Sequence, residues 1–135
     1  MSRALSRVAR LATATAMAAA AASCSSSPGP AATVETFMHA MGDKNPDAAC
    51  GVVSTGGRPL QGDLLAQCRV GLQKVLAEVR SEEFAALRQA KVTGASVNGD
   101  KATVRPDQIT QVPAGYANTI ELVRIDGRWY IDSTG

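Results

Sequence analysis

A change in hydrophobic periodicity near Lys91 constrains the fold of this chain more than any other feature. Up to that point the apolar residues recur at helical spacing. Beyond it, Asn98-Gly99 and Asp126-Gly127 stand between apolar runs, and both dipeptides are typical of two-residue β-hairpin turns. This order predicts an α+β domain in which N-terminal helices pack on one face of an antiparallel sheet.

Two short helices are predicted at the start of the helical region. The first has Thr33 as its N-cap, ends at Gly42 and carries an apolar stripe made of Val34, Phe37, Met38 and Met41. The second begins at Asn45-Pro46-Asp47, which supplies an N-cap, a proline and an acid in the order that a first turn favours. A loop is predicted at 54–59, after an inner helix face formed by Ala49, Cys50 and Val53.

The longest helix is predicted to follow, with Asp63 as its N-cap. Its apolar side chains keep helical spacing and are Leu64, Leu65, Cys68, Leu72, Val75, Leu76 and Val79. A further short helix is predicted to begin at Ser81, and its apolar contacts are Phe84 and Leu87.

The turn at Asp126-Gly127 predicts the register of two strands, 118–125 and 128–133. The predicted core face consists of Ile120, Leu122, Trp129 and Ile131. The opposite face pairs Val123 with Tyr130 and Glu121 with Asp132, and Arg124 lies beside Trp129 in a cation–π contact. An earlier hairpin is predicted to join 92–97 to 101–105, and a loop or bulge follows between Pro106 and Pro113.

Residues 1–23 have the order of a secretory signal peptide. Arg3, Arg7 and Arg10 precede an uncharged, weakly apolar run of twelve residues at 11–22, and small residues follow. A transmembrane anchor is the competing interpretation, but it would need roughly 20 apolar residues to span the hydrocarbon. The mature domain is therefore expected outside the cytoplasm.

Ala21-Ala22-Ser23-Cys24 resembles the lipobox of bacterial lipoproteins, in which small residues precede a cysteine that becomes lipidated. The departure from that motif is Ala21, where leucine is usual. The alternative is ordinary cleavage that leaves a free Cys24 on a secreted chain, but an odd thiol is a liability in an oxidising compartment. We therefore expect a lipid anchor on Cys24, a flexible tether over 24–32 and a single domain over 33–135.

Cys50 and Cys68 are predicted to form a structural disulfide, the usual state of a cysteine pair in an exported chain. A metal site is disfavoured because no Cys-x-x-Cys is present and His39 is the only histidine. A redox-active pair is disfavoured because 18 positions separate the two cysteines. No metal and no cofactor are expected.

The charge of the mature part gives no case for a nucleic-acid partner. Without the three leader arginines, 11 of the 14 Lys and Arg residues remain against 12 Asp and Glu residues. Aromatic residues make up only 4% of the chain, which is too few for a platform that stacks bases.

The order of helices before strands resembles the NTF2-like (cystatin-like cone) superfamily and, more narrowly, small secreted lipoproteins of actinobacteria. The pieces that carry the resemblance are Met41-Gly42-Asp43, Ala48-Ala49-Cys50 and the closing strand pair over 123–132. It implies a curved sheet that wraps the long helix, with a pocket at the open end. The candidate pocket residues are Phe37, Met41, Leu72, Tyr116, Trp129 and Tyr130.

The candidate catalytic residues are His39, Glu121 and Asp132, each with a plainer interpretation beside it. His39 could act as a general base, but it lies off the apolar stripe and fits a solvated helix position. Glu121 and Asp132 could lie opposite each other, where one carboxylate raises the pKa of the other and the two act as an acid–base pair. Like charges opposite each other, however, destabilise a sheet unless they are solvated.

These features favour a non-enzymatic, membrane-tethered domain outside the cytoplasm that binds an envelope protein or a small apolar ligand. A small pocket enzyme of the isomerase or dehydratase type is one alternative, and it would need an ionisable group that faces into a pocket. A structural accessory of the cell envelope, acting through oligomerisation, is another.

Overall fold

The helix that lies on the sheet is the first one. The computed structural model of the chain describes residues 27–134, and α1 spans Pro30–Gly42 within it. The helix begins before the predicted N-cap Thr33, because Pro30 already has a helical φ and its missing N–H needs no partner in the first turn. Thr33 is instead buried inside the helix and donates its hydroxyl to the carbonyl of Gly29 (3.1 Å). Part of the predicted tether is therefore helical, while the predicted signal peptide and Cys24 lie outside the described residues.

The next segment contains a helix and an unforeseen hairpin. α2 (Pro46–Cys50) has the predicted N-cap, since the Asn45 side chain accepts a hydrogen bond from the Ala48 amide (3.1 Å). The loop predicted at 54–59 is wrong: β1 (Val53–Thr55) and β2 (Arg58–Pro59) pair there, so Val53 belongs to a strand. Gly56 and Gly57 make the turn with φ of 57° and 74°, values that glycine adopts without strain.

The main sheet has six strands in the order β2-β1-β8-β7-β5-β4. Its other members are β4 (Ser96–Asn98), β5 (Lys101–Val104), β7 (Ile120–Ile125) and β8 (Arg128–Asp132). The predicted antiparallel sheet is in fact mixed, because β1 pairs with β8 in parallel. Parallel pairing needs a long connection, which the intervening helices and strands supply.

The register was predicted correctly for one of the two hairpins and was off by one position at the turn of the other. In β7–β8 the pairs Ile125–Arg128 and Leu122–Ile131 confirm the predicted register, and Asp126 and Gly127 both have positive φ. In β4–β5 the closing pair is Asn98–Lys101, so Gly99 and Asp100 form the turn, one position later than predicted.

The strand predicted over 92–97 is broken into two pieces. β3 (Lys91–Val92) pairs with β6 (Ile109–Thr110) in a separate two-stranded sheet, and only β4 joins the main one. The chain leaves the β3 ladder at Thr93, whose amide donates to the carbonyl of Gln108 (2.8 Å). Between the prolines, a 3-10 turn at Pro106–Gln108 and β6 replace the predicted loop or bulge.

The core lies between α1, the sheet and α4 (Ser81–Arg88). α1 contacts β8, β5 and β3, and α4 packs against α1. The predicted core face of the last hairpin is confirmed, with Leu122 buried and its three companions packed against the same cluster. The predicted cation–π contact is also present, with the Arg124 guanidinium 5.3 Å from the centre of a Trp129 ring.

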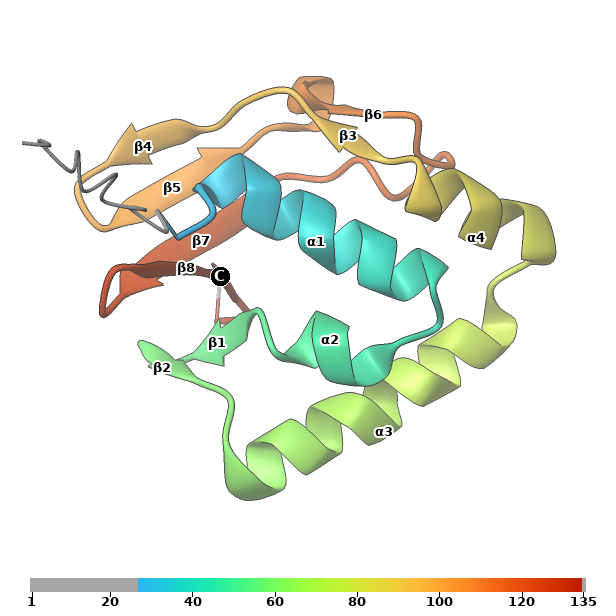
Figure 1. The fold of residues 1–135 in the computed structure, drawn as a ribbon, viewed down its shortest axis with the longest axis horizontal. Coiled ribbons are helices and arrows are strands. Elements are labelled where there is room, and N and C mark those ends of the chain that lie inside the picture. The colour runs from blue at the N-terminus through green and yellow to red at the C-terminus, as the bar shows by residue number, and fades with distance from the viewer. Residues whose placement is uncertain (1–26, 135) are drawn as a thin grey trace, which may run out of the picture.

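The longest helix, α3 (Gly62–Glu78), does not occupy the place that the resemblance implies. Figure 1 shows α3 at the edge of the molecule, with α2 between it and the sheet-bound α1. Only Leu76 of its predicted apolar residues is buried, and its N-cap is Gln61 where Asp63 was predicted. Since α1 covers the sheet, α3 packs on α2, and a Cys50–Cys68 disulfide joins these two helices as predicted.

Candidate functional site

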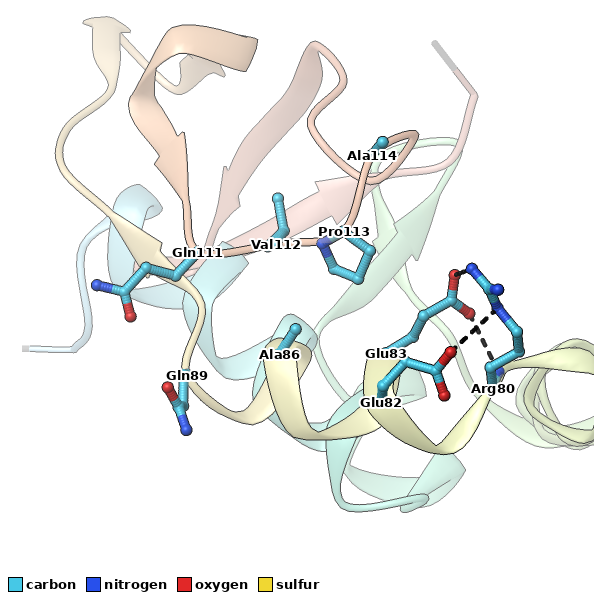
Figure 2. A pocket seen from close by; sticks show the side chains of 9 residues that line it. All are labelled: Arg80, Glu82, Glu83, Ala86, Gln89, Gln111, Val112, Pro113 and Ala114. Atoms are coloured by element: carbon cyan, nitrogen blue, oxygen red, sulfur yellow. Dashed lines mark hydrogen bonds and ion pairs between the residues drawn. The ribbon is translucent and has the colours of Figure 1, made fainter.

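A groove of about 600 Å³ lies between α4 and the segment after β6. Figure 2 shows the helix on one side of the groove and the extended segment on the other. We call it the α4 groove, and its lining consists of Arg80, Glu82, Glu83, Ala86, Gln89, Gln111, Val112, Pro113 and Ala114.

One wall of the α4 groove is set by the start of the helix. Glu83 accepts a hydrogen bond from the backbone N–H of Arg80 (3.1 Å), which satisfies a donor that the first helical turn leaves free. The Arg80 guanidinium lies 3.6 Å from a carboxylate oxygen of Glu82 and 3.6 Å from one of Glu83. These three charged groups therefore form a cluster at one end of the groove, with one more acid than base (Figure 2).

The opposite wall depends on a single backbone conformation. Gln111 has a φ of 62°, which redirects the chain directly after β6. Val112 then packs against the hydrophobic core, while Pro113 and Ala114 continue along α4. Val112 thus attaches this wall to the core. Every residue that lines the groove is at least partly exposed.

The chemistry of the α4 groove changes along its length. Ala86, Val112 and Pro113 provide small apolar surfaces in the middle. Gln89 and Gln111 lie at the end away from the charged cluster, and both are exposed carboxamides that can donate and accept hydrogen bonds (Figure 2). The groove therefore combines apolar contact with two-way hydrogen bonding.

None of the six candidate pocket residues lines this groove. Met41 is part of the buried core, and Phe37, Leu72, Tyr116 and Trp129 are partly buried and packed against it. Tyr130 is buried on the other side of β8, where the Arg128 guanidinium lies 5.7 Å from its ring centre. The sequence did not predict the groove because its two walls come from separate segments, α4 and residues 111–114, which share no periodic pattern. The only sequence signal near the second wall was the pair of prolines at 106 and 113.

Of the six candidate pocket residues, Tyr116 has a hydroxyl whose pKa is affected by a charged residue of the groove, Glu83. Burial raises the pKa of its hydroxyl, and the negative charge of Glu83 raises that pKa further. The phenol therefore stays protonated and remains a hydrogen-bond donor at neutral pH.

The three candidate catalytic residues have separate partners. His39 Nε2 lies 2.9 Å from the carbonyl oxygen of Ala90, which requires this nitrogen to carry the proton that it donates. Glu121 is exposed and accepts a hydrogen bond from the Thr103 hydroxyl (3.0 Å). No hydrogen bond or ion pair within residues 27–134 joins His39, Glu121 and Asp132 to one another, and none of them lines the α4 groove.

The pKa of the Asp132 carboxyl is shifted in the direction opposite to that needed by a general acid. Hydrogen bonds from the side chain and then the backbone of Thr134 lower the pKa of its carboxyl. Acid catalysis by a carboxyl needs a raised pKa, so that the proton is still present near neutral pH.

In the part of the chain that the structure describes, no group of three or more His, Cys, Asp or Glu side chains is placed to hold a metal ion. No helix within residues 27–134 is long and apolar enough to cross a membrane. Comparisons with protein-family models, with curated proteins and with solved structures found no match for this chain.

Proposed function

We propose that this chain is an exported, membrane-anchored binding domain whose α4 groove holds an extended segment of a partner protein. The observation that carries the proposal is the groove itself, an open channel with an apolar middle and exposed amides at one end. A bound peptide presents unpaired backbone N–H and C=O groups, and carboxamides can satisfy both kinds. Its side chains can meanwhile contact Ala86, Val112 and Pro113.

A peptide fits the α4 groove better than a small apolar ligand does. Sites for small ligands bury most of the ligand surface inside a concave, mainly hydrophobic cavity. Here one rim carries the Arg80, Glu82 and Glu83 side chains, which would remain partly hydrated. Glu82 and Glu83 outnumber Arg80, so a segment with a basic residue near that rim is favoured.

The membrane anchor is supported by the leader and by cysteine usage. The signal-like segment at 1–23 and the lipobox-like residues before Cys24 favour export and lipidation. A disulfide between Cys50 and Cys68 suits an oxidising compartment. The helices-first order and the β7–β8 register support a distant relation to the NTF2-like superfamily, which we propose with the function.

The groove is tested by photocrosslinking from inside it. We expect a photoreactive residue at Ala86 to crosslink a partner protein in the cell envelope, because Ala86 lines the groove. The matched control is the neighbouring Ala85, which is exposed on α4 but is not part of the lining. Mass spectrometry of the crosslinked peptide should identify one extended segment with a basic residue.

Two results would contradict the groove proposal. Equal crosslinking from Ala85 and Ala86 would show that contact is not confined to the groove. A small apolar molecule retained in native mass spectrometry, with no protein crosslink from Ala86, would support the ligand alternative.

The anchor makes a separate prediction. We expect the mature protein from a membrane fraction to begin at Cys24 and to carry the mass of a diacylglyceryl group, since two acyl chains are needed for stable anchoring. Cys24→Ala should release the chain into the soluble fraction. A mature terminus at another residue, or an unmodified Cys24, would reject this part of the proposal and leave the groove experiment unaffected.

A further inference from the structure

Exposed large hydrophobic side chains are concentrated on one helix. Within residues 27–134 four such residues are at least half exposed: Leu64 (51%), Val70 (53%), Val75 (50%) and Val97 (56%). The first three belong to α3, and only Val97 lies elsewhere, in the edge strand β4. Helical geometry places Leu64 and Val75 on a flank of α3, about 120–140° around the axis from Val70, so Val70 is the large apolar side chain of the face described next.

One side of α3 is turned away from the rest of the protein. The Cys50–Cys68 disulfide and the buried Leu76 hold the opposite side against the body of the domain. A shallow hollow of about 370 Å³ lies on the free side (Figure 1 shows this helix at the edge of the molecule). We call this side the outer face of α3. The hollow is lined by Ala66, Gln67, Val70, Gly71 and Lys74, and helical spacing adds the exposed Asp63 and Glu78 at the two ends.

The charges of the outer face are arranged so that the face is complementary to itself. Asp63 and Lys74 are eleven positions apart, which is close to three helical turns, so they lie on the same side of the helix at its two ends. Neither forms an ion pair among the described residues. When two copies of α3 run antiparallel, each Asp63 faces the Lys74 of the other copy.

The same arrangement also matches the residues between the two charges. With Asp63 opposite Lys74, Ala66 lies opposite Gly71 and Gln67 lies opposite Val70, twice each by symmetry. Gly71 has no atom within 4 Å of the position that a Cβ would occupy, so it leaves room for the partner's Ala66. Small residues at these positions let two helix backbones approach closely.

We infer that the chain forms a two-fold symmetric dimer through the outer face of α3. A second copy is favoured over an anionic lipid surface because the face carries two acids, Asp63 and Glu78, against one base, Lys74, and is therefore not basic. Pairing along one 17-residue helix, about 25 Å long, gives a small interface, so the dimer is weak in dilute solution. Two copies anchored to the same membrane would meet at a higher effective concentration.

The dimer is tested with the mature chain carrying Cys24→Ser, which prevents a stray disulfide or a lipid from joining two copies. Sedimentation equilibrium up to the solubility limit should show a monomer–dimer equilibrium. Val70→Asp should weaken it by roughly tenfold or more, because each copy would bury a carboxylate without a charged partner at the centre of the interface, opposite Gln67. The matched control is Val97→Asp, which changes an equally exposed valine on β4 and should leave the dimer constant unchanged.

A charge exchange tests whether the two charged ends of the outer face take part in the pairing. Asp63→Lys places a base at both paired positions and Lys74→Asp places an acid at both, so each variant alone should be monomeric. Mixed together, the two variants should form a one-to-one heterodimer, because both cross-pairs are then complementary. Circular dichroism of each variant checks that α3 is still folded.

Three outcomes would overturn the inference: a wild-type chain that is monomeric at every concentration, a dimer that survives Val70→Asp but not Val97→Asp, or charge variants that fail to associate on mixing. None of these outcomes depends on the α4 groove, which lies on a different helix.

Discussion

Removal of the Cys50–Cys68 disulfide is expected to lower the free energy of unfolding by about 3 kcal/mol, the amount that closing a loop of this size contributes in the chain-entropy model. The loss should be largest around α3. Leu76 is the only buried residue of that helix and lies near its C-terminal end, so the disulfide is the main attachment of the N-terminal half. Cys50 is almost fully buried, which makes alanine the suitable replacement.

The measurement is urea unfolding of the double variant Cys50→Ala/Cys68→Ala, combined with amide hydrogen exchange. Exchange in α3 should accelerate more than exchange in α1, which keeps its contacts with the sheet. Cys24→Ala is the matched control and should leave the unfolding midpoint unchanged. An equally stable double variant, or acceleration spread evenly over the helices, would show that other contacts hold α3 in place.

Gly42→Ala is expected to destabilise the domain by about 2–3 kcal/mol, although it adds a single methyl group. A Cβ at this position would lie 2.6 Å from the backbone nitrogen of Arg88 and 2.9 Å from the carbonyl oxygen of Phe84. Both atoms belong to the backbone of α4, which cannot retreat without unpacking Phe84 and Leu87 from the core. The close approach also brings the Arg88 guanidinium to the Gly42 carbonyl (2.8 Å).

The matched control is Gly71→Ala in the middle of α3, where a Cβ would meet nothing within 4 Å. In dilute solution this change should raise stability by up to about 1 kcal/mol, because alanine favours the helix more than glycine does. Thermal unfolding of both variants gives the comparison. Similar midpoints for Gly42→Ala and the wild type would mean that α1 and α4 can separate without loss of core packing.

Gly42 also shows where interpretation from sequence stops short. Its position at the end of the first helix was predicted correctly, but as a helix terminator. Its φ is not in the left-handed region, and the structural reason for glycine there is the passage of α4. A contact between residues some 45 positions apart leaves no local pattern, so only the packed structure reveals it.

The burial of the long helix and the loop at 54–59 were predicted wrongly for a related reason. The apolar spacing of 64–79 correctly indicated a helix, yet it could not tell how much of that apolar surface would be covered. Likewise, the Gly56-Gly57 pair predicts a loop, although paired glycines also suit a tight hairpin turn. In both cases the decisive factor was the neighbour: α1 on the sheet in the first case, and β8 alongside β1 in the second.

The sequence by itself determined the features that depend on short-range sterics and hydrogen bonding. Asn45 caps α2 through its own side chain, Asp126-Gly127 sets the register of β7–β8, and Cys50 and Cys68 form the predicted disulfide. Tertiary structure alone decided which helix covers the sheet, the parallel pairing of β1 and the formation of the α4 groove. These three features depend on which of several distant segments packs on the same apolar surface. The outcome is decided by the free energy of the whole packed domain, which no single stretch of the chain specifies.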